Sequence, residues 1–193
     1  PKKVLVVGGG DGGSLREIVK YPSLEEAVLA EIDEEVVAAS RKYLPEISSA
    51  LDHPKVKIMI GDGMAHVREH EDYYDIIIVD STEPVGPAIG LFGEEFYKDV
   101  FRALKADGIF VAQTESPFFN QDLIRKAYSR IDSVFPLAEL YLANVPTYPS
   151  GLWSFTLGSK KYDPQEVSEL RQPVSTKYYC LDIHQGAFAL PVF

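Results

Sequence analysis

Val4-Leu5-Val6-Val7-Gly8-Gly9-Gly10-Asp11-Gly12-Gly13 is the stretch that decides the fold of this 193-residue chain. An apolar run enters a glycine turn and continues into an amphipathic segment that begins Ser14-Leu15-Arg16-Glu17. Gly8, Gly10 and Gly13 match the spacing G-x-G-x-x-G, which lets a backbone turn sharply off a parallel strand and approach a nucleotide-like ligand. The stretch therefore predicts a strand, a glycine turn and a helix that bind such a ligand.

Asp11 is an unusual residue for a loop of this kind. A loop that holds pyrophosphate on a helix N-terminus would bring this carboxylate against a second anion, and the two would repel. A cation in the same place would be attracted. We therefore expect a ligand that carries a positive group where a dinucleotide carries phosphate.

Apolar runs alternate with helical segments along the rest of the chain. The predicted strands are 4–7, 27–32, 56–60, 76–80 and 109–113. The helices between them are expected from Asp33 to before Pro45, over about 65–70, over 94–104 and over 121–134. This alternation predicts βαβ units and a parallel sheet.

The end of the predicted sheet differs from its beginning. Two strand-like runs, 139–144 and 153–158, flank the turn-forming segment 145–151, which favours an antiparallel hairpin. We therefore expect a doubly wound α/β domain with a mostly parallel, seven-stranded sheet that ends in a hairpin. This is the methyltransferase-like version of the Rossmann-like fold. The expected domain is a core of about 1–160 and a tail of about 161–193, packed on the sheet or on a partner subunit.

Composition limits the possible partners and surroundings. A hydrophobic content of 46% supports one compact domain, and a net charge of −10 disfavours nucleic acid and favours small cations. The single cysteine, Cys180, excludes an internal disulfide and favours a reducing compartment. Without a signal-peptide pattern or an apolar run of ~20 residues, the sequence predicts a cytoplasmic protein with no membrane contact. His66 and His70 have helical spacing but no third ligand, so no metal is predicted.

Acidic residues follow the predicted strands one after another. In an open α/β sheet the carboxyl ends of the strands form the ligand crevice, so these side chains should meet there and attract a cation. They are Asp11, Glu31, Asp33, Asp62, Asp80, Glu83 and Glu115.

Two of these positions have specific interpretations. Glu31 lies about 20 residues beyond the glycine loop, where an acid accepts hydrogen bonds from ribose hydroxyls, whereas Asp33 is better explained as a helix cap. Asp62-Gly63 occupies the position of an adenine contact, or alternatively forms a type I turn. The expected ligand therefore contains adenosine, with its positive end at Asp11.

These motifs together resemble the spermidine synthases, the polyamine aminopropyltransferases. The similar pieces occur in family order along the whole chain: Gly8–Gly13, Glu31–Asp33, Gly61–Gly63, Asp80–Ala88, Val111–Gln113, Pro146–Gly151 and Ala187–Phe193. The resemblance implies transfer of an aminopropyl group from decarboxylated S-adenosylmethionine to a diamine, usually putrescine. The products would be spermidine and S-methyl-5'-thioadenosine, as part of polyamine biosynthesis.

The resemblance also implies the residues of the site. The donor would be held by Gly8, Gly10, Asp11, Glu31, Asp62, Gly63 and Pro87. The diamine would be held by Asp11, Asp80, Ser81, Thr82, Glu83, Gln113 and Tyr148. No cofactor is implied beyond the donor as co-substrate, and the partner is a second copy of the chain in a homodimer or homotetramer. The family's small N-terminal β-domain, which contributes to both pockets, is expected to be absent from this chain.

The implied reaction poses a problem of proton transfer. An alkyl ammonium titrates near 10 and a carboxyl near 4, so a plain aspartate would face a gap of roughly 6 units, about 8 kcal/mol. Clustered carboxylates, an adjacent sulfonium and burial all narrow this gap. We assign Asp80 as the proton acceptor and Glu83 as the neighbour that orients the amine. The family usually carries Asp where this chain has Glu83, which moves the carboxylate by about one bond length, ~1.5 Å.

Three other functions share parts of this pattern. A small-molecule methyltransferase that uses S-adenosylmethionine would share the fold and Glu31, but Asp11 disfavours it. An NAD-dependent dehydrogenase is disfavoured by Asp11 and by the terminal hairpin. A polyamine- or nucleoside-binding module that has lost catalysis is the third alternative. It is compatible with Glu83, because the family usually carries Asp at this position. Gln113, Tyr148 and Trp153 also have a purely structural interpretation, as sheet-end or core residues.

Overall fold

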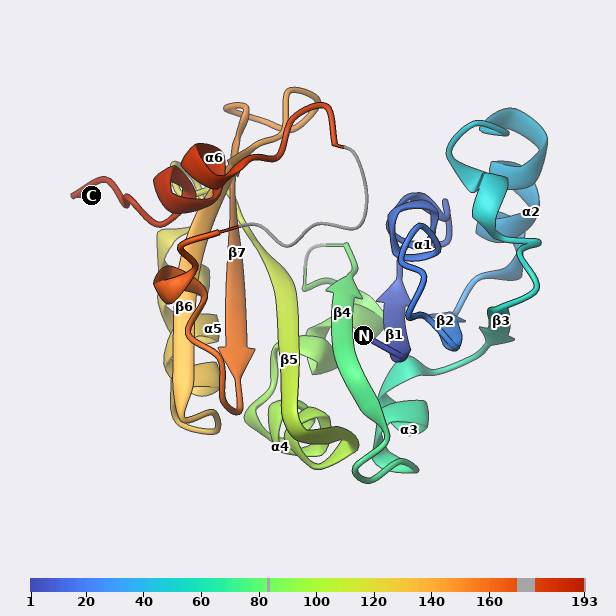
Figure 1. The fold of residues 1–193 in the computed structure, drawn as a ribbon, viewed down its shortest axis with the longest axis horizontal. Coiled ribbons are helices and arrows are strands. Elements are labelled where there is room, and N and C mark those ends of the chain that lie inside the picture. The colour runs from blue at the N-terminus through green and yellow to red at the C-terminus, as the bar shows by residue number, and fades with distance from the viewer. Residues whose placement is uncertain (83, 170–175, 193) are drawn as a thin grey trace.

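The computed structural model describes residues 1–82, 84–169 and 176–192 (Figure 1). Within these residues, seven strands form one sheet in the order β3-β2-β1-β4-β5-β7-β6. The strands from β3 to β5 are parallel, and β7 runs antiparallel to β5 and β6 on either side of it. Their bounds are β1 Lys3–Gly8, β2 Glu26–Glu31, β3 Val56–Ile60, β4 Tyr74–Asp80, β5 Leu104–Glu115, β6 Leu137–Asn144 and β7 Leu152–Ser159. The predicted fold class is confirmed.

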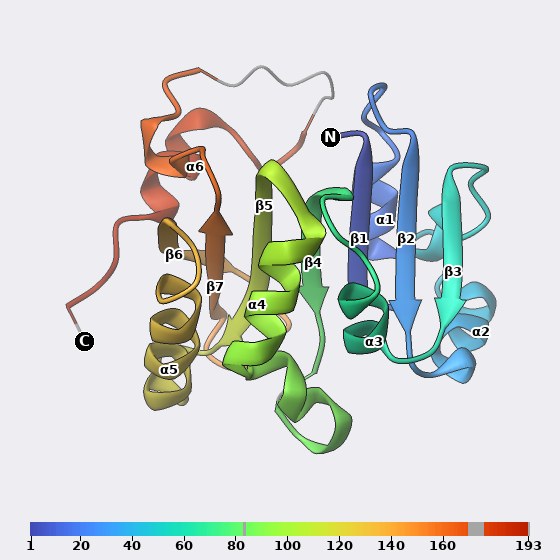
Figure 2. The ribbon, with the colours of Figure 1, turned by 90° about the horizontal axis from the view of Figure 1, so that it is seen from below.

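Helices cover both faces of the sheet. Figure 2 shows α3 (Gly63–Arg68), α4 (Glu94–Ala103) and α5 (Gln121–Asp132) on one face, and α1 (Gly13–Ile18) and α2 (Glu34–Tyr43) on the other. Each face has its own apolar cluster, because alternate side chains of a strand point to opposite sides. Leu5 and Val7 of β1 pack under α3 and α4, whereas Val4 and Val6 pack under α1.

Two aspartates determine where helices begin. Asp33 caps α2 by accepting a hydrogen bond from the amide of Glu35 at 2.8 Å, as expected from the sequence. Asp62 caps α3 by accepting one from the amide of Met64 at 2.8 Å. The sequence predicted that this helix begins near residue 65. Because of the cap, α3 begins two residues earlier, at Gly63. The loop after β4 contains a 3-10 helix, η2 (Gly86–Phe92).

The strand order reverses between β1 and β4. From β1 the chain adds β2 and β3 on one side, and β4 then returns to pair with β1 on the other side. Loops that leave β1 and β4 therefore diverge and open a crevice at the carboxyl ends of these strands. The glycine loop and the segment after Asp80 border this crevice from its two sides.

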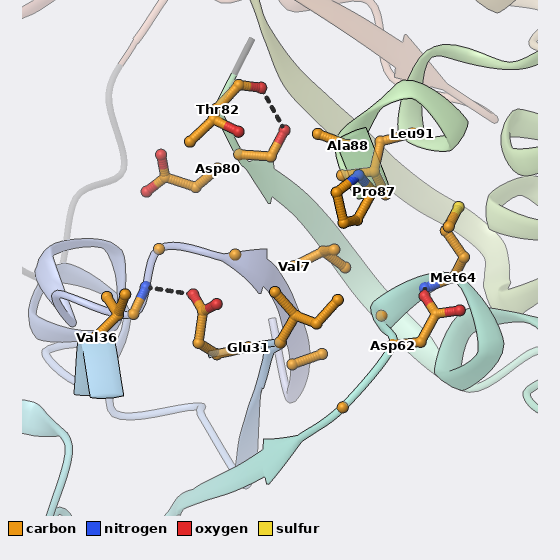
Figure 3. A pocket seen from close by; sticks show the side chains of 18 of the residues that line it. Val7, Glu31, Val36, Asp62, Met64, Asp80, Thr82, Pro87, Ala88 and Leu91 are labelled. Carbon is orange, nitrogen blue, oxygen red and sulfur yellow. Dashed lines mark hydrogen bonds between the residues drawn. The ribbon is translucent and has the colours of Figure 1, made fainter. Parts of the chain in front are cut away.

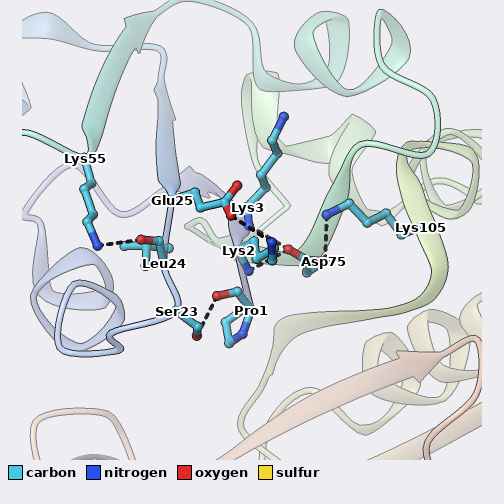
Figure 4. Close-up of polar contacts among 9 residues, drawn as sticks. All are labelled: Pro1, Lys2, Lys3, Ser23, Leu24, Glu25, Lys55, Asp75 and Lys105. Atoms are coloured by element: carbon cyan, nitrogen blue, oxygen red, sulfur yellow. Dashed lines mark hydrogen bonds and ion pairs between the residues drawn. The ribbon is translucent and has the colours of Figure 1, made fainter.

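Asp75 ties the two central strands together at the opposite end of the sheet (Figure 4). Its Oδ2 accepts hydrogen bonds from the amides of Lys2 and Lys3, at 2.7 and 2.6 Å. Its Oδ1 accepts one from Nζ of Lys105 at 2.7 Å. Burial alone would raise the pKa of Asp75, but the hydrogen bonds from Lys105 and the two amides outweigh it and lower the pKa below its usual value.

The C-terminal segment packs on the far edge of the sheet. Helix α6 (Leu181–Ala187) lies against β6, and the ring of Phe188 lies 5.7 Å from that of Tyr141. His184 fixes this segment through the Tyr179 hydroxyl at 2.7 Å and the carbonyl oxygen of Pro164 at 2.6 Å. Pro164 begins the 3-10 helix η3 (Pro164–Glu166).

Two further findings concern expectations about metals and membranes. His66 contacts the Tyr74 hydroxyl at 2.7 Å, and Nδ1 of His70 lies 2.7 Å from the carbonyl oxygen of His66. Both histidines thus have partners inside the protein. In the part of the chain that the structure describes, every helix is too short or too polar to cross a bilayer.

Candidate active site

A cavity of about 500 Å³ lies at the carboxyl ends of the central strands (Figure 3). Its walls come from the glycine loop, the end of β2, the turn before α3, the end of β4 and the segment that leads into η2. In Figure 3, Asp62 and Asp80 lie at opposite ends of the cavity, with Glu31 between them. Most of the residues predicted from the sequence meet here: Gly8, Gly10, Asp11, Glu31, Asp62, Gly63, Asp80, Ser81, Thr82 and Pro87.

The glycine loop brings the backbone of β1 close to two carboxylates. Gly8, Gly9 and Gly12 have positive φ angles of 78°, 68° and 81°, which favour glycine. A Cβ on Gly9 would lie 2.9 Å from Oδ2 of Asp80, and one on Gly10 would lie 2.8 Å from Oε2 of Glu31. The sequence pattern had placed the third required glycine at Gly13, but Gly12 is the residue in the left-handed conformation, at the start of α1.

Glu31 is held in place by backbone amides. Its Oε2 accepts a hydrogen bond from Gly10 at 3.1 Å, and its Oε1 accepts one from Asp33 at 3.0 Å. The residue is buried, with 8% of its surface exposed, yet it lines the cavity. A buried carboxylate fixed in this way retains acceptor capacity for hydroxyl groups of a ligand.

Asp11 and Asp62 each combine a local hydrogen bond with exposure to the cavity. Oδ1 of Asp11 accepts a hydrogen bond from the amide of Gly13 at 2.9 Å, which leaves its other oxygen available. Asp62 caps α3 through one oxygen in the same way. The two interpretations of Asp62, turn residue and cavity residue, are therefore compatible.

Asp80 is held by two side chains. Oγ of Ser14 donates a hydrogen bond to its Oδ2 at 3.0 Å, and Nε2 of Gln113 donates one to its Oδ1 at 3.3 Å. Gln113 also donates to the carbonyl oxygen of Ser81. Burial raises the pKa of Asp80, and the negative charges of Asp11 and Glu31 raise it further, although the Ser14 hydrogen bond opposes them.

A second cavity of about 250 Å³ meets the first at Asp80. It lies over the central strands on the α1 side and is lined by Asp80, Gln113 and Ser14 together with Tyr141, Phe155, Ile78, Val79 and Val111. Asp80 thus faces both cavities. A carboxylate shared in this way can contact two small molecules at once.

Tyr148, Asp33 and Glu115 were also expected at this crevice, but they line neither of the two cavities. Tyr148 is on the β6–β7 hairpin, where its ring centroid lies 4.5 Å from that of Trp153. Burial raises the pKa of its hydroxyl, and the charges of Asp80, Asp11 and Glu115 raise it further. Glu83 is outside the described residues.

Several contributors to the site were not predicted from the sequence, among them Ser14, Tyr141 and Phe155. Ser14 was interpreted only as the start of a helix, although a hydroxyl directly after a glycine loop is well placed to reach the neighbouring strand end. Tyr141 and Phe155 were assigned to the hairpin without a role, and their stacked rings, 5.2 Å apart, form a wall of the second cavity. No signal in a single sequence indicates which face of a hairpin closes a pocket.

The arrangement has clear chemical capabilities. It can hold a nucleoside in the larger cavity and a small amine in the smaller one, and it offers a carboxylate with a raised pKa between them. The four carboxylates that line the larger cavity also stabilise positive charge.

Comparison with known proteins agrees with this description. The family model described as "Spermine/spermidine synthase domain" matches residues 1–169. The polyamine aminopropyltransferase of Moorella thermoacetica is 60% identical over 194 residues, which cover 100% of this chain and 69% of that protein. The enzyme of the same name from Caldicellulosiruptor bescii is 59% identical, with 100% and 70% covered.

Two solved structures are similar over nearly the whole chain. A spermidine synthase in complex with the transition state analogue AdoDATO has a TM-score of 0.91 and 45% identity, with 99% of this chain and 67% of that chain covered. Spermidine synthase from Thermotoga maritima has a TM-score of 0.88 and 45% identity, with 99% and 66% covered.

Proposed function

This chain belongs to the spermine/spermidine synthase family, and from this premise we propose that it transfers an aminopropyl group from decarboxylated S-adenosylmethionine to putrescine. The products are spermidine and S-methyl-5'-thioadenosine. The observation that carries the proposal is the meeting of Asp11, Glu31 and Asp80 around one cavity at the end of the parallel strands. Three acids in this place favour a cationic nucleoside and a cationic acceptor.

The donor occupies the larger cavity in this proposal. Glu31 binds its ribose hydroxyls, and Asp62 with Gly63 binds its adenine. Pro87, Gly8 and Gly10 shape the walls. Asp11 binds the amine of the aminopropyl group and would repel the carboxylate of intact S-adenosylmethionine. The acid at position 11 therefore selects the decarboxylated donor.

The acceptor diamine lies beside Asp80. Ser81, Thr82 and Gln113 contribute to its site, together with Tyr148, Asp11 and Glu83. Asp80 takes a proton from the attacking ammonium, and the free amine then attacks the methylene carbon next to the sulfonium. A carbon–nitrogen bond forms, the carbon–sulfur bond breaks, and its electron pair stays on sulfur as the neutral thioether. The raised pKa of Asp80 narrows the gap to the ammonium and so eases the first step.

The remaining parts of the proposal concern composition and assembly. The reaction uses no cofactor besides the donor, and this chain of 193 residues is the catalytic domain. We further propose a homodimer or homotetramer that acts in the cytoplasm on small molecules. The single cysteine supports a reducing compartment.

An assay of products tests the proposal directly. The protein is incubated with decarboxylated S-adenosylmethionine, with and without putrescine, and the products are separated by chromatography. We expect S-methyl-5'-thioadenosine and spermidine in equal amounts, and only when the diamine is present. Cadaverine, agmatine and spermidine, tested in parallel, define the preferred acceptor.

Intact S-adenosylmethionine provides the matched comparison. Isothermal titration should show much weaker binding of the intact form, because Asp11 faces its carboxylate. Equal affinity for the two forms, together with methyl transfer, would replace this proposal by a methyltransferase. Binding of both substrates without turnover would instead identify a module that has lost catalysis.

A further inference from the structure

The turn between β6 and β7, residues 145–151, is here called the hairpin tip. Its own backbone hydrogen bonds join Val145 to Gly151 at 2.8 Å, Tyr148 to Val145 at 2.9 Å, and Gly151 to Tyr148 at 2.9 Å. Ser150 and Gly151 both have φ angles of 69°. Glycine adopts this conformation freely, but serine does so only at a cost in energy. The conformation of Ser150 therefore depends on contacts beyond its own backbone.

The side chain of Ser150 makes such a contact with the core. Its Oγ lies 3.0 Å from Oγ of Ser116 and 3.3 Å from the carbonyl oxygen of Leu152. A carbonyl oxygen only accepts, so Ser150 donates to Leu152 and Ser116 donates to Ser150. Ser116 is 1% exposed, which makes this hydrogen bond a link between an exposed turn and a buried strand end.

The position of Ser116 is determined by an irregularity at the end of β5. The pairing of β5 with β7 shifts between Gln113 and Glu115, and Glu115 has a positive φ angle of 88°. Oγ of Ser154 on β7 holds the carbonyl oxygen of Glu115 at 2.8 Å, and Asn120 donates to its Oε2 at 2.8 Å. A bulge of this kind changes the direction in which the following side chains point.

The same strand end reaches the proposed base. Gln113, three residues before Ser116, donates a hydrogen bond to Asp80. Segment 113–116 therefore contacts Asp80 at one end and the hairpin tip at the other. The tip carries Tyr148, whose ring centroid lies 4.5 Å from that of Trp153 and which the proposed function assigns to the acceptor site.

We propose that Ser116 and Ser150 are positioning residues, whose hydrogen bond holds the hairpin tip so that Tyr148 faces the acceptor amine beside Asp80. This inference deepens the function proposed above and rests on it. Neither Ser116 nor Ser150 is among the described residues that line the larger cavity. Loss of the bond should therefore weaken acceptor binding and leave donor binding intact.

Steady-state kinetics of Ser116→Ala, Ser150→Ala and the double variant test the proposal. We expect the KM for putrescine to rise about fivefold to tenfold in each single variant, with a smaller change in kcat. The double variant should be no worse than either single variant, because both remove one shared bond. The dissociation constant of S-methyl-5'-thioadenosine should stay within about twofold of the wild type in all three.

Two further variants separate the bond from other effects. Ser133→Ala is the matched control, because it removes an exposed hydroxyl that donates to the carbonyl oxygen of Arg130 at the end of α5. It should behave as wild type. Ser150→Gly removes the hydroxyl but also the cost of the left-handed backbone, so its KM should lie between those of the wild type and Ser150→Ala.

Fluorescence gives a readout that does not depend on turnover. Trp153 is the single tryptophan of the chain and lies against Tyr148, so its emission reports on the hairpin tip. We expect a shifted emission maximum in Ser116→Ala and Ser150→Ala and none in Ser133→Ala. An unchanged KM for putrescine and an unchanged spectrum in folded Ser116→Ala would overturn the proposal. A loss of affinity for S-methyl-5'-thioadenosine as large as the rise in the KM for putrescine would also overturn it. A wild-type protein without transferase activity would contradict the proposed function, whereas the spectra would still test the link.

Discussion

Asp80 combines burial with nearby negative charges. It lies where the two cavities meet and receives hydrogen bonds from Ser14 and Gln113. Asp11 and Glu31 repel its negative charge, and burial disfavours that charge further. The ionised form of Asp80 is therefore destabilised in the folded protein, as expected of a base that must accept a proton from an ammonium group.

An Asp80→Asn variant should lose activity and gain stability. Removal of the base should lower kcat about 10²- to 10⁴-fold, and should remove the acidic limb of the pH profile of kcat/KM. The folded-state pKa of Asp80 is raised, so deprotonation at rising pH costs stability in the wild type. Asparagine avoids this cost, and we expect a higher Tm for the variant at pH 7 but no gain at a pH below the carboxyl range. Calorimetry at the two pH values and a product assay measure both effects.

Gln113→Glu is the informative companion to that variant. Glutamate keeps the shape of the Gln113 side chain, but it replaces the amide group that donates a hydrogen bond to Asp80 with a further carboxylate. Full activity of Asp80→Asn, with an unchanged pH profile, would contradict the assignment of Asp80 as base.

Single residues could be predicted where their chemistry is local. Glu31, Asp62 and Asp80 follow strands, and the fold brings the ends of parallel strands together, so their meeting at one cavity followed from the sequence. The contact of Ser14 with Asp80 was not predicted, because 66 residues separate them and the pairing of β1 with β4 is what brings them together. Their roles in binding and catalysis stay predictions.

At the scale of elements, sequence patterns identified strands better than their ends. The apolar run 109–113 predicted the centre of β5, which extends over Leu104–Glu115. The additional residues are 104–108, Thr114 and Glu115. Leu104 pairs with Tyr74 of β4, and Glu115 pairs with Ser154 of β7. The bulge at Gln113–Glu115 could not be predicted either, since nothing in this polar segment distinguishes a bulge from regular pairing.

Asp75 offers a test of how β1 is attached to β4. In Asp75→Asn, the ion pair with Lys105 is lost and the hydrogen bonds from the amides of Lys2 and Lys3 weaken. We expect the free energy of unfolding at pH 7 to fall by about 2 kcal/mol, the size of charge-assisted hydrogen bonds. Urea titration of the two proteins measures this difference.

The pH dependence of the Asp75 contribution has a definite sign. The pKa of Asp75 is lower in the folded protein than in the unfolded chain, so its stabilising effect is complete above the unfolded pKa. It disappears as the pH falls through the folded pKa, and the two proteins should then unfold alike. Glu25→Gln is the matched control, because it breaks an exposed ion pair with Lys2 at 2.9 Å and should leave Tm unchanged. Equal stability of Asp75→Asn and wild type at pH 7 would show that the amides of β1 find other partners.

For the whole molecule, the alternation of strands and helices was sufficient to predict the layers, and the turn-forming segment 145–151 between two strand-like runs predicted the antiparallel end of the sheet. It was insufficient to place the tail, because α6 is short and its contacts with β6 involve residues about 40 positions earlier in the chain. The second cavity could not be predicted for the same reason, because its walls combine side chains from β4, β5, β6 and β7. Long-range packing of this kind leaves no periodic trace in the sequence.

The overall charge of the molecule predicts a dependence of catalysis on salt. The chain carries a net charge of −10, and Asp11, Glu31, Asp62 and Asp80 line one cavity. Both proposed substrates are cations, so the field of the protein should attract them to the crevice, and added salt should screen this attraction. We expect kcat/KM for putrescine to fall about threefold or more between 50 and 200 mM NaCl. S-methyl-5'-thioadenosine is neutral and is the proposed product in the same cavity, so its dissociation constant should change little over that range. If both constants respond equally to salt, ions act on the stability of the site rather than on the approach of the substrates.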